Sequence, residues 1–240
     1  LRRDDYIRAK EAFGFNVVDL YGPSTGWSSL PNTNWLDEMY RPGTEQNHTL
    51  FLSGGSDRSN FYVSGNYGKI NGTRIGNSIE RYTFRVNSDH KIGKRFKVGQ
   101  TLYANLRNED PNASTNQGDI SFRNTPVMNV YDPTNPVGGW GKSPKGFQGG
   151  NDVQGAIGNY TKNEGYEVLL TVNAEAEITK GLILRAVLGT GFNGANNYTY
   201  NYRADLGSVQ SEETFSKYLS KIQSYIATYT LTYDRSFGDH

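Results

Sequence analysis

Apolar and polar side chains alternate almost without fault between Ile79 and Ile92. The apolar face carries Tyr82, Phe84, Val86 and Ile92, and the polar face carries Arg81, Thr83, Arg85, Asn87, Asp89 and Lys91. An alternation with period two predicts a β-strand that has one apolar and one polar face.

The same alternation recurs along the chain and predicts about seven strands. They begin near His48, Asn60, Ile79, Phe96, Tyr166, Leu182 and Tyr225. Short turns near Gly54, Gly93 and Gly181 alternate with longer polar connections after Gly68, Leu106 and Asn193. Long strands joined alternately by short turns and long loops are the sequence signature of a transmembrane β-barrel.

We therefore expect an all-β fold, an antiparallel transmembrane β-barrel segment with long extracellular loops. Seven strands cannot close a bacterial barrel of the usual kind, in which the strand number is even and at least eight, so the rest of the barrel is expected elsewhere. Four aromatic residues lie near predicted strand ends, where interfacial girdles are expected: Tyr82, Tyr166, Phe192 and Tyr233.

The pattern divides the chain into two regions. Residues 1–46 are expected to form an extracellular loop region, with a possible short helix from Asp4 to about Phe13 and a helical turn around Leu36 to Tyr40. Residues 47–240 are expected to hold the strands, with long loops at 107–165 and 194–221. Short turns mark the periplasmic end of such barrels and long loops the extracellular end.

Composition fits this picture and excludes several classes of protein. No apolar run approaches the length of a membrane-spanning helix, and the mean hydropathy is -0.69. A net charge of +1 without a basic, aromatic-rich run argues against nucleic-acid binding. The chain has no cysteine, and its N-terminus has no apolar targeting segment, so we interpret it as an interior piece of a longer polypeptide.

Four short motifs occur in a characteristic order. They are NWLDEMY from Asn34 to Tyr40, QNHTLFLSGGS from Gln46 to Ser56, YTFRVN from Tyr82 to Asn87, and KIGKRFKVG from Lys91 to Gly99. With them the chain resembles the SusC/RagA group of TonB-dependent outer-membrane transporters, strongly over about residues 30–106 and moderately over 166–193.

The resemblance implies a plugged barrel of the 22-stranded class in the bacterial outer membrane. It implies uptake of glycan fragments or peptides, together with a SusD-like surface lipoprotein. It also implies energy from the TonB complex acting through a plug domain, and this chain has no recognisable plug or TonB-contacting segment.

Candidate chemistry is sparse. Glu167, Glu175 and Glu177 share a strand face and could in principle form the carboxylate pair of a glycosidase. A polar lumen wall explains them better, because Arg81, Arg85, Lys97 and Arg185 occupy the same class of position. We expect no enzyme activity, no metal and no cofactor. Asp132 with Asn135, and Asn151 with Asp152, are better explained as turn-forming residues than as a calcium site.

Aromatic residues in the expected extracellular regions are candidate contacts for a ligand or a lipoprotein lid. They are Tyr131, Trp140, Phe147 and Trp27, of which Trp140 and Phe147 are flanked by glycines. Packing of the loops on themselves is the simpler explanation of these side chains.

A secreted, soluble all-β binding or adhesion module is the alternative to a membrane barrel. Strand length separates the two, since barrel-spanning strands need about nine to eleven residues and soluble sheets commonly use about five or six.

Overall fold

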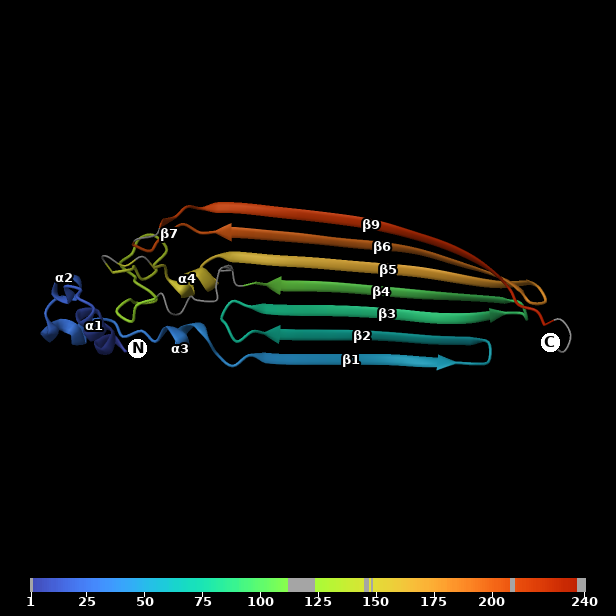
Figure 1. Ribbon diagram of the computed structural model, residues 1–240, viewed down its shortest axis with the longest axis horizontal. Coiled ribbons are helices and arrows are strands. Elements are labelled where there is room, and N and C mark those ends of the chain that lie inside the picture. The colour runs from blue at the N-terminus through green and yellow to red at the C-terminus, as the bar shows by residue number, and fades with distance from the viewer. Residues whose placement is uncertain (1, 112–123, 145–146, 148, 208–209, 237–240) are drawn as a thin grey trace.

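The computed structural model describes residues 2–111, 124–144, 147, 149–207 and 210–236. Long strands lie side by side in one sheet, and the helices gather at one end of it (Figure 1). The helices are α1 Arg3–Ala12, α2 Val17–Tyr21, the 3-10 helix η1 Ser24–Ser29, α3 Trp35–Met39 and α4 Asp152–Ile157. The strands are β1 Thr44–Gly55, β2 Ser59–Asn71, β3 Ser78–Ile92, β4 Phe96–Asp110, β5 Tyr160–Thr179, β6 Leu182–Asn201, β7 Ala204–Asp205, β8 Gln210–Ser211 and β9 Thr214–Tyr233.

Seven of the strands form an antiparallel sheet in the order β1-β2-β3-β4-β5-β6-β9. The strands of this sheet are 12 to 20 residues long, and β7 and β8 form a separate short ribbon. The expected antiparallel barrel segment of about seven strands is confirmed. Among the described residues β1 and β9 pair on one side only, so the sheet is open at both edges.

The two ends of the sheet differ. Three short turns, at 56–58, 93–95 and 180–181, join the strands at one end, which we call the turn end. Gly93 and Gly181 there have φ of +65° and +80°, a left-handed conformation that favours glycine. The longer connections lie at the opposite end, which we call the loop end, with helices α1 to α4 and the ribbon strand β7 (Figure 1).

The strands extend further toward the loop end than the alternation predicts. β5 begins at Tyr160, β6 continues to Asn201 and β9 begins at Thr214, so the connections span 111–159 and 202–213. The expected bounds 107–165 and 194–221, and a first strand starting near residue 47, are corrected accordingly. These extensions show no clean alternation, because Lys217 and Lys221 interleave with Phe215 and Leu219 on one face of β9. Unbroken register pairing across β5, β6 and β9 forms them.

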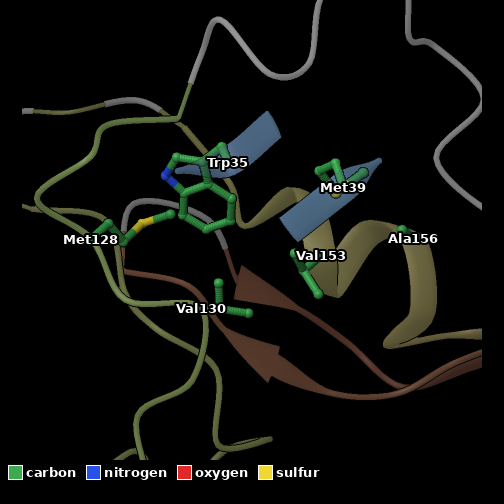
Figure 2. Close-up of a cluster of buried hydrophobic side chains, with 6 residues drawn as sticks. All are labelled: Trp35, Met39, Met128, Val130, Val153 and Ala156. Atoms are coloured by element: carbon green, nitrogen blue, oxygen red, sulfur yellow. The ribbon is translucent and has the colours of Figure 1, made fainter. Parts of the chain in front are cut away.

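All buried apolar side chains among the described residues lie outside the seven-stranded sheet, in the loop-end region that we call the cap. One cluster joins Trp35 and Met39 of α3 to segments far away in sequence (Figure 2). Its remaining members are Met128, Val130, Val153 and Ala156. The Trp35 Nε1–H donates a hydrogen bond to the carbonyl of Thr125 at 2.9 Å. The cap thus unites the N-terminal region and the connection between β4 and β5 in one packed unit.

A second cluster fastens the N-terminal helices to the same unit. Ile7 of α1 and Val17 of α2 pack with Val127. None of the helices in the described ranges is long and apolar enough to cross a membrane.

Candidate functional site: the two faces of the sheet

One face of the sheet is a continuous apolar surface. A single register row across five strands consists of large aliphatic side chains: Leu52, Val63, Val86, Leu102 and Leu170. Leu170 is 38% and Leu52 65% exposed, although both are large apolar side chains. Soluble monomers rarely expose an apolar band that crosses every strand of a sheet, so this face fits a lipid environment.

An aromatic row borders the apolar surface toward the loop end. Tyr67, Tyr82 and Tyr166 belong to one register row, and the rings of Tyr67 and Tyr82 lie 5.1 Å apart. The next row toward the loop end is polar, with Glu80 accepting a hydrogen bond from the Tyr67 hydroxyl at 2.7 Å. An aromatic row followed by a polar row is the arrangement expected at a membrane interface.

The apolar band runs obliquely across the sheet. Leu50 and Leu52 form it on β1, and register pairing leads from Leu52 to Tyr225 on β9. On β9 the band runs from Tyr225 to Tyr233, while Lys221 is already polar. The band centre therefore shifts by about five residues, or about 17 Å, over six strand spacings of about 4.8 Å each. This corresponds to a strand tilt of about 30°, close to the roughly 35–45° of membrane barrels.

The opposite face is polar and rich in charges. At the turn end, Glu175 Oε1 lies 2.8 Å from Lys97 Nζ, and its Oε2 lies 2.7 Å from Arg185 Nη2. These two cations occupy both carboxylate oxygens of Glu175, so the geometry is that of a structural ion-pair cluster and not of an acid-base pair. The cluster lines a pocket of about 430 Å³ with Arg58 and Asp89. Arg85 lies over the Tyr103 ring, 5.5 Å from its centroid.

Two of the four candidate contact residues lie together in the cap. Tyr131 and Trp140 form an antiparallel bridge, and their rings stack with centroids 5.1 Å apart. Trp140 is partly buried against the cluster of Figure 2, whereas Tyr131 is 56% exposed. A Cβ on Gly138 or Gly158 would come within 3.0 Å of the Trp140 ring, so both glycines make room for it. Trp140 thus braces the more exposed Tyr131 ring.

The other two candidates lie elsewhere. Trp27 packs against the cluster of Ile7, Val17 and Val127, and its Nε1–H donates to the carbonyl of Gly22 at 3.1 Å. The backbone N–H of Phe147 donates a hydrogen bond to the carbonyl of Pro144 at 3.1 Å. The structure therefore does not gather the four residues into one site.

The Asx residues considered for calcium satisfy local hydrogen bonds. Asp132 Oδ1 accepts from the backbone N–H and the hydroxyl of Thr134, at 2.9 and 2.6 Å, and these bonds lower the pKa of the Asp132 carboxyl. Asn151 Oδ1 accepts from the Gln154 N–H at the start of α4. The described ranges contain no group of three or more His, Cys, Asp or Glu that could hold a metal ion.

A further feature of the polar face follows from the register and not from a motif. Arg107 lies directly opposite Arg81 on the neighbouring strand. The sequence patterns do not single out Arg107, because it lies at the point where the alternation in that strand ends.

The chain matches no protein-family model. It is 29% identical over 253 aligned residues to TonB-dependent receptor P3 of Formosa agariphila, a match that covers 100% of this chain and 24% of that protein. It is 32% identical over 72 residues to TonB-dependent receptor P26 of the same organism, which covers 30% of this chain and 7% of P26. The chain therefore spans about a quarter of the length of P3.

Solved structures show the same fold. A chain of the RagAB peptide importer in its closed-closed state superposes with a TM-score of 0.72, over 99% of this chain and 30% of that chain, at 17% identity. The open-open state of the same importer gives 0.64 over 95% of this chain and 29% of that chain, again at 17% identity.

The expected resemblance is confirmed: the chain is similar over its whole length to a TonB-dependent receptor, has the fold of the RagAB barrel, and is a barrel segment of the bacterial outer membrane.

Proposed function

We propose that this chain forms part of the barrel wall of a TonB-dependent importer for glycan fragments or peptides. The observation that carries the proposal is the oblique apolar band, bordered by aromatic residues, on a sheet whose sequence matches a TonB-dependent receptor from end to end. The RagAB structures are of a peptide importer, which supports a peptide as one class of cargo.

The turn end faces the periplasm and the loop end the outside of the cell, since outer-membrane barrels have short periplasmic turns and long extracellular loops. The apolar face contacts lipid and the polar face lines the lumen. The cap stands outside the membrane, where a SusD-like lipoprotein lid meets the barrel. The exposed Tyr131 ring, supported by Trp140, is the best placed of the aromatic candidates to contact the lid or the ligand. Trp27 and Phe147 have supporting roles in the cap.

Transport then needs no covalent chemistry from these residues. Ligand enters between lid and cap and passes along the polar face once the TonB complex has displaced a plug domain contributed by another part of the polypeptide. A soluble adhesion module would need neither strands of 12 to 20 residues nor an apolar band across one sheet face.

The test uses outer membranes of the source cell, separated on a denaturing gel with and without boiling. An antibody raised against residues 124–144 detects the protein. We expect a heat-modifiable band much larger than 26.8 kDa, and deletion of the gene should abolish energised uptake of peptides or oligosaccharides. A soluble band of 26.8 kDa would refute the importer proposal.

A further inference from the structure

Two arginines stand side by side on the polar face near the loop end. Arg81 of β3 and Arg107 of β4 are direct register partners. Like charges directly opposite each other destabilise an antiparallel pair. Arg107 reaches Glu109 at only 3.9 Å, and Arg81 has no carboxylate within 4.0 Å among the described residues. Most of the ten or so N–H donors of the two guanidiniums are therefore available to a ligand.

Glycines leave room on both sides of this arginine pair. Gly68 pairs with Arg81, and Gly165 pairs with Arg107, in the same register row. A Cβ at either glycine would meet no atom closer than 3.9 Å. Arg81 and Gly68 line a pocket of about 150 Å³. Arg81, Arg107 and Gly165 line a second pocket of about 240 Å³.

The neighbouring row toward the turn end offers hydrogen-bonding groups. In register order it contains Asn66, Thr83, Asn105, Glu167 and Asn193. Amide and hydroxyl groups of this kind suit the hydroxyls of a sugar. Glu167 lines the larger pocket together with both arginines, so two positive charges face one negative charge there.

We propose that Arg81 and Arg107 bind an oxyanion on an imported oligosaccharide, either the carboxylate of a uronic acid or a sulfate ester. The guanidinium fork matches such planar or trigonal oxygen sets with two parallel hydrogen bonds. The amide and hydroxyl row holds the adjoining sugar ring, and the glycine hollows admit it. This inference rests on the proposed importer function and narrows its cargo to acidic oligosaccharides.

The test is calorimetric titration of the purified full-length receptor with its lid. The probes are tetragalacturonate, a sulfated galactan tetrasaccharide, neutral galactotetraose and the acidic peptide tetraglutamate. We expect Arg81→Gln or Arg107→Gln to weaken binding of an acidic probe by about tenfold or more, because each removes a charge-assisted hydrogen bond. Glu167→Gln should strengthen it, and all variants should bind the neutral probe as the wild type does.

Two further variants separate a binding role from a structural one. Lys91→Gln removes the same charge from the same face of β3, far from the pair, and should leave binding unchanged. Gly165→Val fills the larger hollow without a change of charge and should weaken acidic ligands. Heat-modifiability of each variant on a gel verifies that its barrel has assembled.

Binding of only one acidic probe supports the proposal and identifies the oxyanion. The proposal is overturned if neither acidic probe binds the wild type more tightly than the neutral probe, or if neither arginine substitution changes that binding. Arginine-dependent binding of tetraglutamate instead would overturn the oligosaccharide assignment. Binding needs no TonB energy, so arginine-dependent binding without uptake in cells would refute the importer role and leave the site intact.

Discussion

The assignment of lipid and lumen faces can be tested at two adjacent residues of β5. Leu170 lies on the apolar face in the row of Leu102 and Val86, while Leu169 lies on the polar face opposite Tyr103 and Gly191. The two side chains are 38% and 42% exposed in this chain, so they differ in facing and hardly in burial. Leu170→Arg and Leu169→Arg therefore introduce the same charge at the same height, one into lipid and one into the lumen.

The expected cost follows from the depth of Leu170. It lies four residues below Tyr166 of the aromatic row, which is about 14 Å along the strand. With the strand tilt of about 30° the depth is about 12 Å, close to the midplane of an apolar band about 25 Å tall. An arginine on the lipid face at the midplane costs about 2–4 kcal/mol, whereas lumen positions tolerate charge.

The assay is the yield of heat-modifiable barrel in outer membranes, together with its unfolding midpoint in urea. Leu170→Arg should lower both, and Leu169→Arg should remain close to the wild type. Equal losses in the two variants would mean that the effect is steric, and a loss confined to Leu169→Arg would show that the two faces are assigned the wrong way round.

Three further predictions concern the cap and the aromatic row. Trp35→Ala should destabilise the cap locally by about 3–5 kcal/mol, because it opens a cavity in the cluster and removes the hydrogen bond to the Thr125 carbonyl. The rate at which a protease cleaves the cap of the assembled receptor measures this loss of stability. Lys142 Nζ lies 2.5 Å from Asp205 Oδ2, and this contact and the hydrogen bond from the Gly207 N–H lower the pKa of Asp205 below its ordinary value of 3.8. The Lys142–Asp205 ion pair therefore stabilises the cap above about pH 3.8, and its contribution is lost as the pH falls through the lowered pKa. Pepsin cleavage of the cap should accordingly rise below about pH 3.8 in the wild type, and Asp205→Asn should remove that part of the pH dependence. Gly194→Ala should displace the Tyr166 ring that covers Gly194 and lower the stability of the barrel by about 0.2–1 kcal/mol. Tyr166→Ala should destabilise the barrel less in the Gly194→Ala background than alone, and the midpoint temperatures of heat modification on a gel measure both effects.

The strands within the membrane could be predicted because lipid imposes a pattern on the sequence. Every second residue is apolar from Tyr82 to Val86 on β3 and from Tyr166 to Ile178 on β5, and the alternation places the aromatic residues Tyr82 and Tyr166 at its border. Beyond that border both faces meet water or protein, so the first residues of β5 and the last of β6 are polar throughout. Only the cross-strand pairing reveals that the strands continue there, and no pattern within a single segment reports it.

The cap could be predicted from the sequence only in small part, because the residues of its core do not recur with a regular period. Trp35 and Met39 are spaced as on one helix face, but Met128 comes from an irregular segment and Val153 from the short helix α4 within the same connection. Their association depends on tertiary packing between segments about a hundred residues apart. For the same reason the sequence does not reveal that Trp140 braces Tyr131 while Trp27 belongs to another cluster.

The arginine pair lies between these two cases. The turn at 93–95 fixes Ile92 opposite Phe96, and counting back along both strands places Arg81 opposite Arg107. Half of the proposed subsite thus follows from one hairpin. The other half, Gly165 beside Arg107, depends on the register of β5 against β4 across a connection of nearly fifty residues, which only the packed structure sets. The proposed subsite therefore lies on strands of the barrel wall, but its shape depends on how the connection between β4 and β5 sets the register of Gly165 against Arg107. Changes in that connection would alter the ligand preference of the subsite without altering the apolar band on the opposite face of the sheet.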